Sequence, residues 1–291
     1  MKDLFKLLFM ALFVLLVYIY RNDIVFFIYD KVIYRNNVLS YNEYYLNNNY
    51  EYFKIIDTDS VKNKQELLDM LYTIVNSGDD RYAFYCKYSG CTDDVKTLIN
   101  DENFLPNINN FVHPYNSFDY INVDFTALDR VTITNKKVYN EEEIEYINNY
   151  IEDFTKNNIT NGMSDYDKIK EFHDYIINLY EYDEQKSNKS YSAYNLITKG
   201  KAICGGYSDL IAIYLNYLGI KNYKITSETH IWNLVYLDGK WYHLDATWDD
   251  PIASDGKQHL LHNFFMISTE ELFNLDKVEH NFDKDVFKEA N

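Results

Sequence analysis

The stretch Lys201-Ala-Ile-Cys-Gly-Gly-Tyr-Ser208 predicts how the second half of the chain is built, because it joins a glycine-bearing loop to an amphipathic helix. The predicted helix starts at Cys204 and ends at Gly219. A thiol at the first position of a helix faces unsatisfied backbone N–H groups and the positive end of the helix dipole, which favours the thiolate. Cys204 is therefore a candidate nucleophile. Gly205 and Gly206 are candidates for an oxyanion site, since they keep side chains away from an approaching substrate.

A candidate base and its orienting acid lie downstream, on two strands joined by a turn at residues 238–239. With a two-residue turn, His230 and Asp245 become diagonal neighbours on one face of the hairpin. Diagonal pairs lie roughly 7–8 Å apart, near enough for a carboxylate to orient an imidazole ring after a small shift. Trp232 lies between these two positions and is a candidate wall of the cleft, although a tryptophan here is more often a core residue. The sequence thus supplies a nucleophile, a general base and an orienting acid, which covalent acyl chemistry requires.

These motifs together resemble the core of the bacterial transglutaminase-like superfamily. The resemblance covers about residues 140–270. The segments that carry it are Lys201–Ser208, Thr229-His-Ile-Trp-Asn-Leu-Val235, Gly239-Lys-Trp-Tyr-His-Leu-Asp-Ala-Thr-Trp-Asp-Asp-Pro251 and the preceding helix with Phe172-His-Asp-Tyr-Ile176. It implies a papain-like α+β fold, with the nucleophile helix packed on an antiparallel sheet. It also implies a Cys-His-Asp triad, carried here by Cys204, His230 and Asp245. Gly205 departs from the larger polar residue of many relatives, which puts substrate preference in doubt but leaves the triad intact.

The expected activity is attack of Cys204 on an amide carbonyl of a protein or peptide substrate, giving a thioester. Water would resolve this thioester in a peptidase-like reaction, and an amine would resolve it in a cross-linking reaction; the sequence leaves both open. The alternative from another class is a catalytically inactive surface module that binds peptides in the same cleft. We expect no cofactor and no metal ion. Substrate identity, oligomeric state and the second oxyanion donor are not determined by the sequence.

The periodicity of the chain predicts a small α/β region ahead of the catalytic domain. The predicted domains are residues 1–35 (signal anchor), 36–62 (tether), 63–138 (N-terminal α/β region) and 139–291 (catalytic domain). Predicted helices cover residues 65–75, 93–99, 140–157, 164–182 and 204–218. Predicted strands cover residues 82–88, 120–125, 130–134, 222–227, 230–237, 240–246 and 260–267.

The charge of the chain excludes nucleic acid as a partner. There are 45 acidic and 28 basic residues, a net charge of −17. Residues 1–35 carry five basic and three acidic side chains, or +2, which leaves −19 on residues 36–291. A protein that binds phosphate backbones needs a basic surface to displace counterions. The negative charge of residues 36–291 is expected to disfavour acidic substrates and to tolerate basic ones.

The N-terminus contains an apolar run that predicts contact with a membrane. Leu7–Tyr20 has no charge, and taking in Leu4 and Phe5 across Lys6 extends the run to seventeen residues, the lower limit of roughly 17 for a membrane-spanning helix. We expect an uncleaved signal anchor, a single pass through the cell membrane and an extracellular catalytic domain. A cleaved signal peptide is the alternative, but residues 18–30 contain none of the small residues that cleavage requires.

The three cysteines divide into a close pair and a distant one. Cys86 and Cys91 flank a turn at Ser89-Gly90, so an oxidising exterior would allow a disulfide between them. Two unrelated thiols remain the alternative, because sequence does not give a Cα separation. A zinc site is not expected here, since no second pair of ligands has a suitable spacing.

Overall fold

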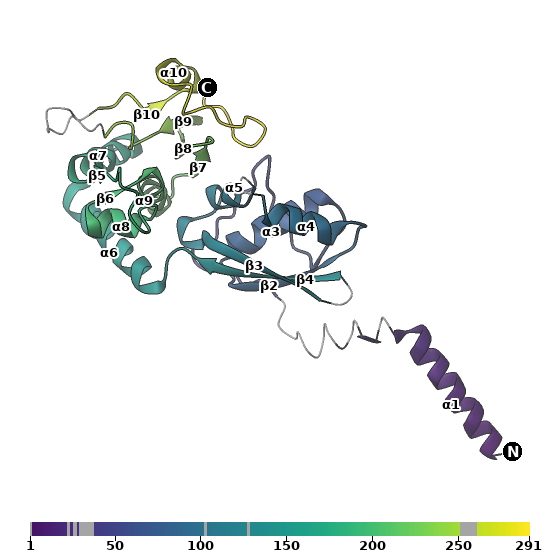
Figure 1. Ribbon diagram of the computed structural model, residues 1–291. Coiled ribbons are helices and arrows are strands. Elements are labelled where there is room, and N and C mark those ends of the chain that lie inside the picture. Colours follow the sequence, from purple (N-terminus) through teal and green to yellow (C-terminus); the bar gives the residue numbers. More distant parts are fainter. Residues whose placement is uncertain are drawn as a thin grey trace.

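The computed structural model describes residues 2–21, 24, 25, 28, 38–101, 104–126, 129–250 and 261–291. Within these ranges the chain forms two four-stranded sheets, each associated with its own helices (Figure 1). The first sheet belongs to the N-terminal part of the body and the second to the C-terminal part. This mixed architecture confirms the predicted α+β class.

The second sheet and the helices beside it are formed by the residues that resemble the transglutaminase-like core. Its strand order is β10-β9-β8-β7, and every neighbouring pair is antiparallel. The strands are β7 (Asn222–Thr226), β8 (Ile231–Leu237), β9 (Lys240–Leu244) and β10 (Phe265–Ile267). The helices are α6 (Glu141–Asn158), α7 (Asp165–Leu179), α8 (Ala193–Lys199), α9 (Cys204–Tyr217) and α10 (Thr269–Leu275). Two short strands, β5 (Glu181–Tyr182) and β6 (Lys201–Ala202), pair in parallel immediately before α9.

The first sheet has the order β1-β2-β4-β3, with β1 parallel to β2 and the other pairs antiparallel. Its strands are β1 (Ser60–Val61), β2 (Arg81–Cys86), β3 (Phe118–Thr126) and β4 (Arg130–Lys137). Its helices are α3 (Lys64–Ser77), α4 (Cys91–Ile99), α5 (Phe104–Asn110) and the 3₁₀ turn η2 (Pro114–Asn116). Cys86 and Cys91 form a disulfide with a Cα–Cα distance of 5.6 Å, at the end of β2 and the start of α4.

The second sheet is covered on both faces, which explains why the middle of β8 is buried continuously. Val235 and Leu244 belong to the core shared with α6, α7 and α9. Trp232 and Leu234, on the opposite face of β8, belong to a core that continues into the N-terminal part. Phe111 stacks there on Tyr223 of β7, with ring centroids 5.0 Å apart. Apolar packing therefore crosses the predicted boundary at residue 138, and that boundary remains a prediction.

Most predicted elements occur close to their expected positions. Asn140 caps α6 with a capping box to Glu143, and the Ser164 side chain accepts from the backbone of Asp167 to cap α7. The strand predicted at residues 260–267 is shorter in the structure, where β10 begins at Phe265. Residue 260, the first of the predicted strand, lies outside the described ranges. The sequence did not predict β1, β5, β6, α5, α8 or α10, which are short elements fixed largely by tertiary packing.

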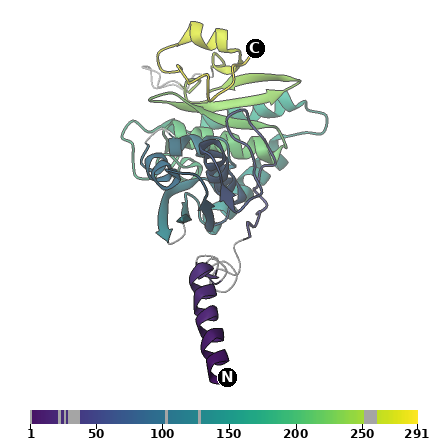
Figure 2. The same cartoon turned by 90° about the vertical axis from the view of Figure 1, so that its right-hand side faces the viewer.

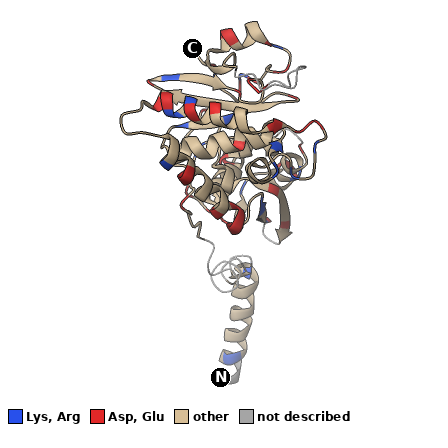
Figure 3. Ribbon diagram, turned by 90° about the vertical axis from the view of Figure 1, so that its left-hand side faces the viewer, with Lys and Arg blue, Asp and Glu red and all other residues tan. Residues whose placement is uncertain are grey.

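The N-terminal apolar run forms α1 (Lys2–Ile19), which stands away from the other elements (Figure 2). Its apolar side chains from Phe5 to Ile19 are exposed. In the part of the chain that the structure describes, no helix combines the length and apolarity needed to cross a bilayer, so the expected span is not supported. Residues 29–37, the end of the predicted anchor and the start of the tether, are outside the described ranges. Acidic residues are spread over the helices, strands and loops that follow α1 (Figure 3).

Candidate active site

Cys204 occupies the first position of α9 and is partly exposed. Its helix begins at an Ile203 N-cap that makes no side-chain capping hydrogen bond, so no side chain competes for the N–H groups of the first turn. Gly206 is required by packing, since a Cβ there would lie 2.5 Å from the Ala202 Cβ. The N–H of Gly206 donates to the Ile203 carbonyl at 2.9 Å. Cys204 and Gly205 therefore offer the N–H groups best suited to an oxyanion.

His230 lies immediately before β8 and is held by a turn with Ser227. The backbone N–H of Ser227 donates to the His230 carbonyl at 3.0 Å, and the Ser227 Oγ accepts from the His230 N–H at 3.1 Å. The His230 Nε2 lies 2.5 Å from Asp245 Oδ2, and Cys204 lies near enough to the imidazole to raise its pKa. Burial by itself would lower the pKa of His230, but Asp245 and Cys204 outweigh it and raise that pKa to about 10. Since Nε2 faces Asp245, Nδ1 is the nitrogen that remains for Cys204.

Asp245 follows β9 and is almost completely buried. Its Oδ1 accepts from the Thr247 N–H at 3.0 Å and from the Thr247 hydroxyl at 2.6 Å. Its Oδ2 faces His230 and, at 3.0 Å, the Nε2 of His280. Burial would raise the pKa of Asp245, but the two histidines hold it well below its usual range. The carboxylate is therefore ionised and fixed in orientation.

The three predicted residues thus come together as the sequence analysis expected. The predicted register of the β8–β9 hairpin is confirmed, because Leu237 pairs with Lys240 and Asn233 with Leu244. His230 and Asp245 are closer than a diagonal pair because both lie just beyond the paired residues and the loops turn them inward. The arrangement can deprotonate a thiol, stabilise the resulting imidazolium and return a proton to a leaving group.

Trp232 is buried and stacks on the His230 ring, with centroids 5.6 Å apart and an interplanar angle of 14°. Its indole N–H donates to the Nδ1 of His243, whose Nε2 lies 2.8 Å from the Thr269 hydroxyl. Burial lowers the pKa of His243 to about 3, so this ring is neutral. Trp232 therefore supports the base from within the core, a position from which it offers no face to a substrate.

His280 is a site residue that the sequence analysis missed. It is fully buried in the segment after α10, and its Nδ1 lies 3.0 Å from Asp276 Oδ2. Asp245 thus accepts from histidines on both sides. The sequence offered no signal for this contact, because His280 lies 35 residues beyond Asp245 and outside the quoted motifs.

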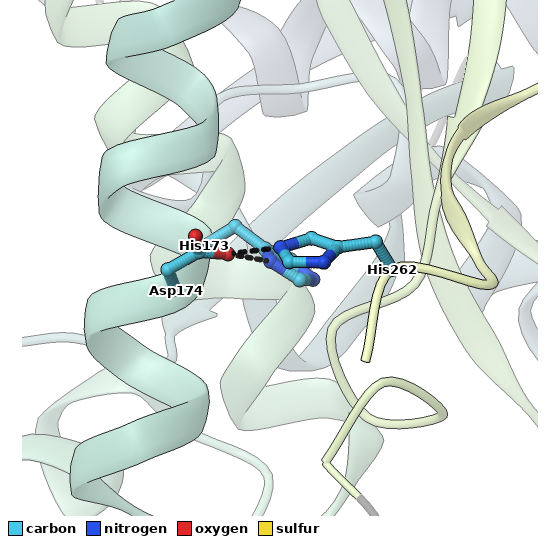
Figure 4. A group of neighbouring side chains, drawn as sticks. All are labelled: His173, Asp174 and His262. Carbon is cyan, nitrogen blue, oxygen red and sulfur yellow. Dashed lines mark hydrogen bonds and ion pairs between the residues drawn. The ribbon is translucent and has the colours of Figure 1, made fainter. Parts of the chain in front are cut away.

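Two side-chain clusters in the described residues have donors that a metal ion would use. One is His230, Asp245 and His280, in which each donor already belongs to the triad network. The other is His173, Asp174 and His262, which lies between α7 and the segment before β10 (Figure 4).

The family model of the Transglutaminase-like superfamily matches residues 152–246, which include all three triad residues. Kyphoscoliosis peptidase of Mus musculus is 23% identical over an alignment of 141 residues, and the match covers 40% of this chain and 21% of that protein. This chain therefore aligns with about a fifth of that relative's length.

Two solved structures show a weak similarity to part of this chain. One is a TGase, with a TM-score of 0.33 and 18% identity, over 49% of this chain and 47% of the other. The second is a candidate cysteine protease from Cytophaga hutchinsonii, with a TM-score of 0.30 and 15% identity, over 44% of this chain and 61% of the other.

Proposed function

Residues 152–246 form a domain of the transglutaminase-like superfamily, and from that premise we propose that the chain is a thiol enzyme acting on amide bonds of proteins or peptides. The observation that carries this proposal is the grouping of Cys204, His230 and Asp245, in which Asp245 contacts the His230 imidazole and both partners raise its pKa. A binding module that had lost catalysis would have no need of a buried, ionised carboxylate, which costs folding free energy unless its hydrogen bonds are satisfied.

The proposed reaction begins from a Cys204 thiolate beside the His230 imidazolium, a pair formed because the raised pKa of His230 lets it hold the thiol proton, and the sulfur attacks an amide carbonyl. The carbonyl oxygen becomes an oxyanion at the N-terminus of α9, where backbone N–H groups and the helix dipole stabilise it. His230 then protonates the leaving amine, and a thioester remains on Cys204. Asp245 keeps the imidazolium in place during both transfers.

We favour hydrolysis of this thioester over transfer to an amine. Bacterial members of the superfamily, which this chain resembles, include hydrolases. The net charge of −17 supports basic rather than acidic substrates, since like charges repel at the approach to the cleft. Added salt is expected to weaken that preference by screening.

The test is labelling of the full chain with a thiol-directed acyl probe, read by mass spectrometry at Cys204. We expect fast labelling of the unchanged chain, none in Cys204→Ala, and a strongly reduced rate in His230→Ala. Trp241→Phe is a matched control, since it conserves an aromatic in the same sheet away from the triad. Equal, slow labelling with and without His230 would favour the inactive binding module instead.

Product analysis then separates the two enzyme reactions. With a glutamine-containing peptide and a primary amine, a cross-linking enzyme gives the amine adduct, whereas a hydrolase gives a free carboxylate. A product mixture that does not change with amine concentration would support hydrolysis.

We also propose that α1 holds the chain at a cell membrane with the catalytic domain outside. The support is the row of exposed apolar side chains from Phe5 to Ile19 together with the Cys86–Cys91 disulfide, a bond typical of oxidising compartments. Fractionation of cells, followed by protease treatment of intact cells, tests this. Recovery of the full chain in the soluble fraction would refute it.

A further inference from the structure

A second cluster of ligating side chains lies apart from the proposed chemistry. His173 and Asp174 are neighbours on α7, and His262 approaches them from the segment that leads into β10 (Figure 4). The donor atoms of the three side chains all lie within 4.8 Å of one another. The proposed reaction uses none of these residues.

The two imidazoles converge on one oxygen. Asp174 Oδ1 lies 3.1 Å from the Nδ1 of His173 and 2.6 Å from the Nε2 of His262. Bonds of about 2.0–2.2 Å to a tetrahedral zinc ion would set neighbouring nitrogen and oxygen ligands roughly 3.3 Å apart. The cluster reaches that spacing by a small outward movement of His262, whose side chain is 33% exposed.

A buried carboxylate stands behind the cluster. The outer nitrogen of His173, Nε2, lies 3.2 Å from Asp249 Oδ2, and both side chains are fully buried. Although this distance suits an ion pair, neither atom forms a hydrogen bond with the described residues at the present ring angle. A carboxylate on the outer nitrogen is the arrangement that orients a metal-bound histidine. A small rotation of the His173 ring would satisfy both atoms.

We propose that His173 Nδ1, Asp174 Oδ1 and His262 Nε2 form a binding site for a divalent transition metal ion, with Zn²⁺ as the best match. Two imidazoles and one carboxylate suit zinc, and a water molecule completes four-coordination on the exposed side of His262. Asp249 orients His173 from the second shell. Lys170 Nζ, 2.5 Å from Asp174 Oδ2, leaves Oδ1 as the ligating oxygen and weakens binding by its positive charge.

The site would connect the metal ion to the loop that carries the catalytic aspartate. The Asp249 N–H donates to the Asp245 carbonyl at 3.3 Å, and Asp249 Oδ1 accepts from the Phe264 N–H at 3.0 Å. A bound ion would therefore tie α7, this loop and the start of β10 together. Zinc is expected to raise the unfolding temperature of the chain, because it binds the folded state selectively.

The test is calorimetric titration of the metal-stripped full chain with Zn²⁺, with Co²⁺ absorption as a second readout. Every variant carries Cys204→Ala, so that the thiol cannot bind the ion. We expect one ion per chain and a d–d absorption band of tetrahedral Co²⁺. His262→Ala is expected to abolish binding, and Asp249→Asn to weaken it by about tenfold or more, as loss of a second-shell partner does.

Lys170→Ala provides the matched control. It removes a neighbour of the same carboxylate without removing a metal ligand, so we expect equal or tighter Zn²⁺ binding. Absence of saturable binding, or an affinity that is unchanged in His262→Ala, would overturn the proposal and leave the cluster as a hydrogen-bonded link. These measurements do not depend on catalysis, so their failure is distinguishable from failure of the proposed function.

Discussion

Two groups of buried polar side chains, one beside each sheet, differ in what they contact. Beside the first sheet, Asp69 is buried on α3, and its Oδ1 accepts from the Lys54 N–H at 2.9 Å. Asn76 on the same helix bonds both backbone groups of Leu46. At the second sheet, buried polar side chains contact one another instead: His230 with Asp245, and Asp245 with His280.

This difference distinguishes side chains that stabilise the fold from side chains that can take part in catalysis. A buried side chain that satisfies backbone groups fixes a loop and has no proton to exchange with a neighbour. Buried titratable side chains that face one another shift each other's pKa values, which is the usual property of an active site. By this criterion the N-terminal part supports the fold, and the C-terminal part would carry the proposed reaction.

The largest effect is expected when one buried aspartate in each part of the chain is replaced by asparagine. Asp245→Asn is expected to lower the rate of Cys204 acylation by about 10³- to 10⁴-fold, because an amide does not stabilise the His230 imidazolium. Asp69→Asn is the matched control, since its amide oxygen still accepts from Lys54, and its rate should stay near that of the unchanged chain. Labelling kinetics with the acyl probe measure both. A similar loss in the two variants would contradict the division.

A smaller effect is expected from His280→Phe, which keeps a ring against Phe264 but removes the donor to Asp245. A charge-assisted hydrogen bond of about 1.5–3 kcal/mol corresponds to roughly a 10- to 100-fold slower acylation. The pH dependence of acylation tests the same contact, because His280 affects the pKa of His230 through Asp245. In the unchanged chain, reactivity that needs the His230 imidazolium is lost as the pH rises through about 10.

His280→Phe concentrates the Asp245 charge on His230, raises the pKa of His230 further and moves this alkaline limb to higher pH. Acylation rates measured across the alkaline range record the shift. His280→Gln, with an amide donor, should recover part of the rate. A rate that falls equally at every pH would mean that His280 has a packing role alone.

The smallest effect concerns the disulfide of the N-terminal part. Replacing Cys86 and Cys91 together by alanine is expected to lower the free energy of unfolding by about 2 kcal/mol, since the bond closes a short loop. Acylation of Cys204 should not change, because the loop contributes no side chain to the triad. Denaturant unfolding and probe labelling of the same sample measure the two quantities. A slower acylation would show that this part also positions the active site.

Much of the C-terminal part was predictable because its signals are local. The caps at Asn140 and Ser164, the helix from Cys204 and the turn at residues 238–239 each depend on neighbouring residues. Because side chains alternate between the two faces of a strand, a two-residue turn at 238–239 then places His230 and Asp245 on the same face. The short helices α5, α8 and α10 were missed, because segments of seven residues are stable only when packed against the body.

The sequence by itself determined a thiol at a helix start, a histidine and an aspartate in register, and a resemblance of this segment to the transglutaminase-like superfamily. The tertiary structure decided which distant residues surround them. It brought His280 from the segment after α10 to Asp245, and His262 to the His-Asp pair on α7. It also buried Trp232 beneath the base. Local patterns determine periodicity, caps and turns, whereas a contact between segments 35 or 88 residues apart depends on how the whole chain packs.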